Sequence, residues 1–461
     1  MFGVIAALVS AALGWFGTGL HPLWWLTWLA PLPVFWYART ASWRAAALVA
    51  FAAWFAGGFN MWGYMHGLIR LPVPLTLLFF AIPAAVFALA VLAWRREMRA
   101  GRAWRAALLP PLIWVTFEYL QAIASPHATF GSIAYTQMDC LPVVQIASLA
   151  GIYGISFLLW LTPSALATRR WPVMAAVAGV VAAVVGFGVW RLRPGAEGDV
   201  RVALIASDAP QDHWARNEQE ALAILSRYAT RVESVHRADI VVLPEDLGPV
   251  PNSALGQARA ILGDAARRAG VELVAGLRMG QTPPMLNEAL VFRPDGTLEA
   301  AYEKLHLIPG LEDGIVVGSQ IVTLPGRQGL QGVQICKDLD FPALSREYGR
   351  RGVGLLLVPA WDFDADGWLH DRMAVLRGVE NGFSIARAAR NGLLTVSTSR
   401  GLVSLERATS PTGFVVAEGA VREEHSDTLY TKAGDWFAWV SIAALAALLV
   451  TGWRRRAALV R

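Results

Sequence analysis

The chain has 461 residues, of which 55% are hydrophobic and 16% are charged, and its formal net charge is +5. So few charges over this length are atypical of a soluble protein and indicate membrane-spanning segments. The positive charge does not indicate nucleic acid as a partner, because most arginines of the N-terminal part stand between apolar stretches. The two cysteines, Cys140 and Cys336, lack the spacing of a zinc site, so the sequence predicts no metal and no cofactor.

Residues 1–191 are predicted to form a transmembrane bundle of about seven helices. Several apolar stretches carry tryptophans at their ends, as in an interfacial belt, and each has about the length needed to cross a hydrocarbon core of ~30 Å. The predicted spans cover residues 2–19, 22–38, 45–65, 73–94, 106–124, 147–167 and 172–190. Glu118 lies inside the fifth span, where the sequence assigns it no role.

The distribution of arginine predicts the orientation of this bundle. Arginines gather in the connections after the second, fourth and sixth spans, whereas the alternate connections are nearly free of them. Cytoplasmic loops carry such an excess, so the N-terminus is predicted to be cytoplasmic and residue 192 onward to lie across the membrane. Residues 435–453 form an eighth predicted span, and the basic tail 454–461 is then cytoplasmic. A buried C-terminal helix is the alternative, which the three consecutive arginines of the tail disfavour.

Residues 199–425 alternate short β-rich runs with amphipathic helical stretches, which predicts one layered α/β domain on the extracytoplasmic side. The predicted strands cover residues 200–207, 239–245, 271–277, 287–296, 332–338 and 352–360. The predicted helices cover residues 217–235, 253–269, 342–348 and 369–390. We therefore expect a multispan α-helical membrane bundle of about eight spans that carries an α/β domain.

Three segments of this domain place an ionisable residue directly after an apolar run. They are VVLPEDLG with Glu245, AAYEKLHLIPG with Lys304 and GVQICKDLDFP with Cys336. A thiol becomes a nucleophile when a carboxylate takes its proton, and an ammonium group stabilises the oxyanion that forms on a carbonyl. Glu245, Lys304 and Cys336 thus supply a base, an electrophilic clamp and a nucleophile. No G-x-S-x-G motif competes with them.

The motifs LPE, YEKLHLIPGLE and ICKDLDFP resemble the three catalytic motifs of the nitrilase (carbon–nitrogen hydrolase) superfamily, whose fold is an α-β-β-α sandwich. The runs VRVALIASDAPQDHW and DRMAVLRGVENGFSIARAARNG are similar to further segments of that family. The spans on both sides of the domain resemble the apolipoprotein N-acyltransferase family in particular. The resemblance implies that Glu245 is the general base, Lys304 the oxyanion-stabilising residue and Cys336 the nucleophile. It also implies that Glu312 orients the site, although GLEDG is equally an ordinary solvated turn.

The same resemblance implies a reaction and its partners. Cys336 would take an acyl chain from a membrane phospholipid as a thioester and pass it to the α-amine of a diacylglyceryl-modified lipoprotein. The expected location is the bacterial inner membrane, with the catalytic domain periplasmic and both termini cytoplasmic. We expect a monomer without a cofactor, whose partners are membrane lipids, the phospholipid donor and the lipoprotein acceptor.

Four further residues are candidates for the surroundings of the site. Lys337 and Asp338 follow the nucleophile and are expected to support it, or to pair with each other or with Glu380. Trp361 and Glu380 are expected to line the substrate pocket, while packing at the sheet edge is the alternative for Trp361.

Three features differ from the pattern of the acyltransferase family. Leu243 stands where that family has an aromatic residue, Lys337 and Asp338 stand where it has Tyr-Glu, and the interval from Lys304 to Cys336 is short. These features resemble a nitrilase-type amidase, so hydrolysis of an extracytoplasmic amide stays open as the second hypothesis. A transporter is a third one, but it predicts polar residues and broken helices within the spans, of which the sequence shows few.

Overall fold

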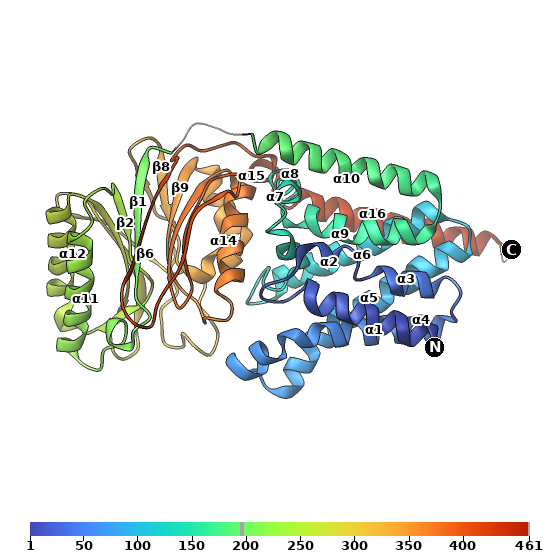
Figure 1. Ribbon diagram of the computed structural model, residues 1–461, viewed down its shortest axis with the longest axis horizontal. Helices are drawn as coiled ribbons and strands as arrows, with labels where there is room; N and C mark the ends of the chain where they lie inside the picture. The colour runs from blue at the N-terminus through green and yellow to red at the C-terminus, as the bar shows by residue number, and fades with distance from the viewer. Residues whose placement is uncertain (194–197, 460–461) are drawn as a thin grey trace. The chain divides into compact units, whose positions relative to one another are not determined.

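The computed structural model describes residues 1–193 and 198–459, with side chains up to residue 451 (Figure 1). The chain forms two compact units, one of Met1–Leu192 together with Ala433–Arg461 and the other of Arg193–Lys432. Each unit is described by itself below. Residues 460 and 461 of the predicted basic tail lie outside the described residues, as do the side chains of the rest of that tail.

The first unit consists of helices. Its longer helices are α1 Phe2–Gly17, α3 Leu32–Ala38, α4 Trp43–Gly58, α5 Val73–Arg99, α6 Ala103–Ala124, α9 Ile152–Thr168, α10 Trp171–Arg191 and α16 Trp436–Leu459. Shorter turns of helix are α2 Trp24–Thr27, η1 Phe59–Met61, η2 Gly63–Leu68, η3 Ile133–Gln137, α7 Leu141–Val144 and α8 Ala147–Ala150. Helix α15, Leu429–Ala433, contains the point in the sequence where the second unit ends and the first resumes.

Three of the described helices, α5, α6 and α10, are long and apolar enough to cross a membrane by length and composition. Shorter apolar helices cover Phe2–Gly17, Leu141–Ala150, Ile152–Thr168 and Trp436–Thr451. The prediction of one span over 22–38 is wrong, because this stretch divides into α2 and α3. Pro31 caps α3 and Pro33 lies in its first turn, where each ring removes a backbone donor and disfavours continuation of the helix from α2. The architecture of about eight spans stays a prediction.

Glu118, which the sequence left without a role, is a structural centre of the helical unit. It lies in α6 and is 7% exposed. Its carboxylate accepts hydrogen bonds from the backbone N–H of Ile133 at 2.8 Å, from the Ser132 hydroxyl at 3.1 Å and from the Ser156 hydroxyl. A buried carboxylate with several donors is well compensated. Glu118 therefore ties the start of η3 and helix α9 to α6.

The second unit contains two sheets. The first has the order β13-β1-β2-β4-β5-β6, with β3 also paired to β4, and the second has the order β12-β11-β10-β9-β8-β7. The strands of the first sheet are β1 Val200–Ala206, β2 Ile240–Val242, β3 Leu247–Val250, β4 Glu272–Met279, β5 Leu286–Phe292, β6 Leu298–Glu303 and β13 Val415–Val421. Those of the second are β7 Thr323–Pro325, β8 Leu330–Val333, β9 Val353–Trp361, β10 Ser384–Arg390, β11 Leu393–Ser397 and β12 Val403–Ala408.

Helices cover the outer faces of both sheets, as Figure 1 shows for α11 and α12 on one side and α14 on the other. The helices of this unit are α11 Glu218–Glu233, α12 Leu255–Ala269, α13 Pro342–Arg350 and α14 Gly367–Asn381, with short turns at Pro210–Asp212, Asn252–Ala254 and Cys336–Asp340. The predicted α/β sandwich with layers α-β-β-α is thus confirmed.

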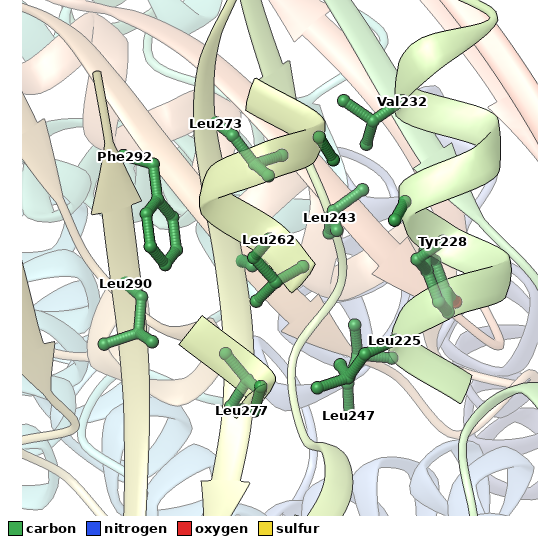
Figure 2. Close-up of a cluster of buried hydrophobic side chains, with 14 of the residues drawn as sticks. Leu225, Tyr228, Val232, Leu243, Leu247, Leu262, Leu273, Leu277, Leu290 and Phe292 are labelled. Atoms are coloured by element: carbon green, nitrogen blue, oxygen red, sulfur yellow. The ribbon is translucent and has the colours of Figure 1, made fainter. Parts of the chain in front are cut away.

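Two apolar layers hold the sandwich together. Leucines and aromatic residues of α11 and α12 pack on the first sheet, where Figure 2 shows Leu225, Tyr228 and Leu262 against Leu243 and Leu273. A second layer of Val, Ile, Leu and Ala side chains fills the space between the two sheets. Each fully buried leucine contributes about 1.5–3 kcal/mol relative to an exposed one. These layers fix the positions of the strand ends that carry the polar residues described below.

The sequence placed most of these elements correctly but extended several too far, because the predicted strands over 239–245 and 287–296 end at Val242 and Phe292. The predicted helix over 369–390 ends at Asn381, because Gly382 has a φ of +74° and residues 384–390 form β10 instead. The predicted strand over 332–338 ends at Val333. Residues Cys336–Asp340 form a 3-10 turn, labelled η6 by its order in the chain, so Cys336 lies in a turn after the strand.

Candidate active site

The carboxyl ends of parallel strands bring the three predicted catalytic residues together. Strand β2 is parallel to β1 and β4, and β9 is parallel to β8 and β10, so polar residues after these strands gather at one edge of each sheet. Glu245 follows β2 and Cys336 follows β8. Lys304 follows β6, which runs in the same direction as β4 because both are antiparallel to β5. All three side chains are buried, with 2%, 1% and 9% of their surface exposed.

Glu245 is held by backbone hydrogen bonds to both sheets. Its N–H donates to the carbonyl of Ala360 in β9 at 3.2 Å, while Gly276 N–H in β4 donates to the carbonyl of Pro244 at 3.2 Å. This close approach requires glycine at 276, because a Cβ there would lie 2.7 Å from the Cα of Glu245 and 3.0 Å from the Cβ of Pro359. The backbone of Glu245 is therefore wedged between β4 and β9.

Replacing Gly276 by alanine tests this wedge. The added methyl group is expected to cost about 1–3 kcal/mol of stability by overpacking and to shift Glu245 away from its partners. The midpoint of thermal unfolding should fall. The enzymatic rate, whether of acyl transfer or of hydrolysis, should fall as well. The matched control is Gly256→Ala in α12, where an added Cβ meets nothing within 4 Å and the helix gains about 1 kcal/mol. Equal stability of both variants would contradict the close packing at Gly276.

Lys304 links two carboxylates. Its Nζ lies 2.7 Å from Oε1 of Glu245 and 2.9 Å from both carboxylate oxygens of Glu312. Burial alone would lower the pKa of Lys304, but the charges of Glu245 and Glu312 outweigh it and raise the pKa above its ordinary value. Lys304 is therefore a permanent cation beside Glu245. Glu312 also accepts the backbone N–H of Ile308 at 2.7 Å, so it anchors the segment that follows Lys304.

Asn287 completes this cluster, and the sequence did not single it out. Its side-chain Nδ2 donates to Glu245 at 2.7 Å and to Glu312 at 2.9 Å. Its backbone carbonyl accepts the backbone N–H of Lys304 at 2.9 Å. Asn287 lies in β5, whose antiparallel pairing with β6 matches Glu288 with Glu303. The register of this hairpin is the signal that could have placed Asn287 beside Lys304.

Cys336 adopts a backbone conformation that is costly for a residue with a side chain. Its φ is +41°, in the left-handed region that ordinary residues avoid at a cost of about 1–3 kcal/mol. The thiol donates to the carbonyl of Trp361 at 3.3 Å. Burial and the negative charge of Glu245 raise the pKa of Cys336, against the opposing effect of Lys304 and Arg387. The resting group is thus a neutral thiol.

The turn after Cys336 is fastened by Asp338. This fully buried carboxylate accepts hydrogen bonds from the Tyr302 hydroxyl at 2.7 Å, from the His306 backbone at 2.9 Å and from the Ile335 backbone at 3.2 Å. It therefore joins β6, the segment after Lys304 and the turn that begins at Cys336. The ammonium of Lys337 lies 3.4 Å from Asp340 and 6.0 Å from the ring centre of Phe341.

Trp361 and Glu380 lie in different surroundings. Trp361 ends β9, and besides accepting the Cys336 thiol it lies under the guanidinium of Arg390, 4.0 Å from the ring centre. Glu380 is fully buried in α14 and forms an ion pair with Arg377 of the same helix at 3.2 Å. The structure thus brings the Trp361 carbonyl to the thiol of Cys336 and pairs Glu380 with Arg377, while lining of a pocket by Trp361 and Glu380 stays a prediction.

A second charged cluster lies next to Trp361. Asp362 forms a two-pronged ion pair with Arg387, and His370 Nδ1 lies 3.2 Å from Asp366. The donor atoms of Asp362, Asp366 and His370 lie within 4.8 Å of one another, a spacing that a metal ion could use. Both oxygens of Asp362 face Arg387, however, so the cations of the chain itself neutralise this cluster.

His370 gives the stability a pH dependence. Burial lowers the pKa of His370, but Asp366, Asp340 and Asp362 act more strongly together and raise the pKa from 6.5 to about 9. The group is thus protonated in the folded state, and its contribution is complete below pH 6.5 and lost as pH rises through about 9. Thermal unfolding is expected to show a midpoint that falls over this interval. In His370→Gln the fall should be smaller, and an unchanged fall would refute the role of His370.

Known proteins resemble this chain in both units. The family model of the apolipoprotein N-acyltransferase N-terminal domain matches residues 10–165, and that of carbon-nitrogen hydrolase matches residues 201–454. An apolipoprotein N-acyltransferase of Geobacter metallireducens is 29% identical over 393 residues, which are 75% of this chain and 74% of that protein. Another from Shewanella oneidensis is 25% identical over 90% of each chain.

An amidase from Nesterenkonia sp. whose crystal structure is known is 24% identical, over 52% of this chain and 94% of that chain, with a TM-score of 0.42. The carbon-nitrogen hydrolase model spans more than half of the sequence. The chain therefore belongs to the carbon–nitrogen hydrolase, or nitrilase, family and resembles the apolipoprotein N-acyltransferases.

Proposed function

We propose that this protein is a membrane N-acyltransferase that moves an acyl chain from a phospholipid to the α-amine of a lipidated N-terminal cysteine of lipoproteins. The observation that carries the proposal is the Lys304–Glu245 ion pair of 2.7 Å beside Cys336, in a chain whose residues 10–165 match the acyltransferase N-terminal domain. The relatives named apolipoprotein N-acyltransferase support it.

The first half-reaction forms a thioester. Glu245 takes the proton of the Cys336 thiol as sulfur attacks the ester carbonyl of the phospholipid. Negative charge develops on the carbonyl oxygen, and the ammonium of Lys304 stabilises it in a water-poor site. The tetrahedral adduct collapses, the ester C–O bond breaks, and the departing lysophospholipid oxygen receives the proton from Glu245. Cys336 then carries the acyl chain.

The second half-reaction forms an amide. The α-amine of the diacylglyceryl-cysteine attacks the thioester carbonyl, and Glu245 accepts a proton from that nitrogen. Lys304 again stabilises the oxyanion. The C–S bond breaks, the sulfur of Cys336 leaves and takes the proton from Glu245, and the enzyme returns to its resting thiol.

The helical unit sets the location in this proposal. The chain lies in the bacterial inner membrane with about eight spans, both termini cytoplasmic and residues 199–425 periplasmic. Both substrates are lipids of the same leaflet, so tethering raises their effective concentration at the site. The protein acts as a monomer and needs no cofactor.

Single-turnover labelling tests the proposal. The purified full-length protein is mixed with vesicles whose phospholipid carries a labelled acyl chain, and label on the Cys336 peptide is measured with and without hydroxylamine. A hydroxylamine-sensitive thioester that chases onto a diacylglyceryl-cysteine peptide as an amide is expected. Cys336→Ala should show neither. Label that appears only as free fatty acid, or no thioester at all, would overturn acyl transfer, and turnover of small amides would then favour an amidase.

A further inference from the structure

Asp246, the residue after the proposed base, connects the two sheets through a pair of arginines. Its Oδ1 lies 2.6 Å from Nε of Arg278, and its Oδ2 lies 3.3 Å from Nη2 of Arg390. Arg278 belongs to β4 of the first sheet and Arg390 is the last residue of β10 in the second. Asp246 is 3% exposed and Arg390 is 1% exposed. One buried carboxylate thus bridges the sheets at the edge that carries the site.

Arg390 also contacts the residue that accepts the Cys336 thiol. Its guanidinium lies 4.0 Å from the ring centre of Trp361, a cation–π contact that compensates a buried cation. Its carbonyl accepts the backbone N–H of Asp362 at 3.0 Å, and the carbonyl of Trp361 accepts the thiol at 3.3 Å. The Arg390 side chain therefore contacts both Asp246, which follows Glu245 in the sequence, and Trp361, whose carbonyl accepts the Cys336 thiol.

The backbone beside Glu245 is held in a costly conformation. Asp246 has a φ of +63°, in the left-handed region, while Glu245 N–H donates to Ala360 across the sheets at 3.2 Å. Holding such a residue costs about 1–3 kcal/mol and persists only where the surroundings determine it. The ion pairs of Asp246 with Arg278 and Arg390 help to hold it, beside the backbone hydrogen bond from Glu245 to Ala360. Loss of these ion pairs would remove two of the contacts that oppose relaxation of residues 245 and 246.

Stability alone does not account for this arrangement. Burial lowers the pKa of Arg390, although Asp246 opposes it, and burial raises the pKa of Asp246 to about 6 despite both arginines. Buried ion pairs of this kind are often no more stable than apolar residues of the same shape. Costly buried charges are, however, common where they orient reacting groups.

We propose that Arg390 is a positioning residue, which holds the Glu245 backbone and the Trp361 carbonyl in register so that base and thiol meet across the two sheets. This inference rests on the roles of Glu245 and Cys336 in the proposed function. It assigns no contact between Arg390 and substrate. The predicted consequence is that Arg390 governs how well Glu245 activates Cys336, whatever acyl compound is processed.

The reactivity of the Cys336 thiol measures this directly. Full-length protein is treated with iodoacetamide from about pH 6 to about pH 10, and modification of the Cys336 peptide is followed by mass spectrometry. In the unaltered protein the rate at neutral pH depends on Glu245. Arg390→Gln is expected to slow it by at least about tenfold at pH 7, with the difference shrinking as rising pH ionises the thiol without the base. Arg390→Lys keeps the charge toward Asp246 and should restore part of the rate.

A partly exposed arginine that follows β5 of the first sheet provides the control. Arg293 pairs with Glu272 at 3.2 Å, and Glu272 begins the strand β4 that carries Arg278 near its other end. Arg293→Gln should lower the midpoint of unfolding yet leave the Cys336 rate within about twofold. Asp246→Asn should slow the rate at least as much as Arg390→Gln does, because it weakens the ion pairs with both Arg278 and Arg390. Adding Arg390→Gln to Asp246→Asn should then change the rate little, because both substitutions break the Asp246–Arg390 pair.

The outcomes separate the two proposals. If Arg390→Gln alkylates at the unaltered rate after correction for the folded fraction, while Glu245→Gln is slow, the positioning role is overturned. If Glu245→Gln is not slow, the base assignment fails and the positioning role fails with it. If both variants are slow but the protein forms no acyl thioester, the acyltransferase proposal falls and the positioning of base and thiol stands.

Discussion

Lys304→Met is expected to reduce the rate of acyl-enzyme formation by about 10²–10³, because the tetrahedral oxyanion loses the ammonium group proposed to stabilise it. The same change leaves the carboxylates of Glu245 and Glu312 buried without the ammonium group that paired with both of them. Removing one member of such a cluster costs about 3–5 kcal/mol, so the midpoint of thermal unfolding should also fall. Single-turnover labelling of Cys336 and thermal unfolding measure the two effects.

A compensated variant separates catalysis from folding here. Lys304→Met combined with Glu312→Gln removes one positive and one negative charge, so the net charge of the cluster returns to its original value. Much of the lost stability should return because the remaining carboxylate of Glu245 keeps its hydrogen bond from Asn287 at 2.7 Å. The acyl-enzyme rate should stay low. Recovery of the rate together with the stability would show that Lys304 acts only as a structural ion-pair partner.

Glu245→Gln is expected to reduce acyl-enzyme formation at neutral pH by about 10²–10⁴, the usual effect of a lost general base. The amide has the shape of the carboxylate but accepts no proton. Burial is the largest cause of the raised pKa of Cys336, so removal of the Glu245 charge lowers that pKa only in part and the thiol stays largely protonated at neutral pH, without a base. The iodoacetamide rate of the variant should therefore be low at neutral pH and rise with pH, whereas that of the unaltered protein should be nearly flat there.

Glu218→Gln is a suitable control for this substitution. Glu218 begins α11 on the outer helical layer, and its carboxylate accepts only the Ser253 hydroxyl among the hydrogen bonds described for it. The control should match the unaltered protein in both the acyl-enzyme rate and its pH profile. A neutral-pH rate in Glu245→Gln that equals this control would exclude Glu245 as the base.

The three candidate catalytic residues could be identified in the sequence because their signal is local. Glu245, Lys304 and Cys336 each follow an apolar run, and their motifs occur in a fixed order with recognisable neighbours. A local sequence motif does not show which residues of other strands contact these three side chains in the folded protein. Asn287 and Arg390 lie in β5 and β10, and only the pairing of strands and the stacking of sheets brings them to the site.

The errors in the elements have a similar origin. Residues 384–390, SIARAAR, contain enough alanine and arginine to read as a continuation of α14, yet they form β10 between β9 and β11. The tertiary environment of two neighbouring strands outweighed local propensity. For the membrane unit, apolar length predicted a single span over 22–38, but the prolines within it decided where the helix breaks.

The raised pKa of Cys336 has a consequence for the survival of the protein. Oxidants attack the thiolate form of cysteine, so a buried thiol that stays protonated at rest is a poor target for sulfenic acid formation or disulfide exchange. In the oxidising compartment that the proposed topology assigns to residues 199–425, an exposed thiolate would be consumed. Activation by Glu245 only as an acyl carbonyl arrives would let a reactive cysteine persist there without a dedicated reductant.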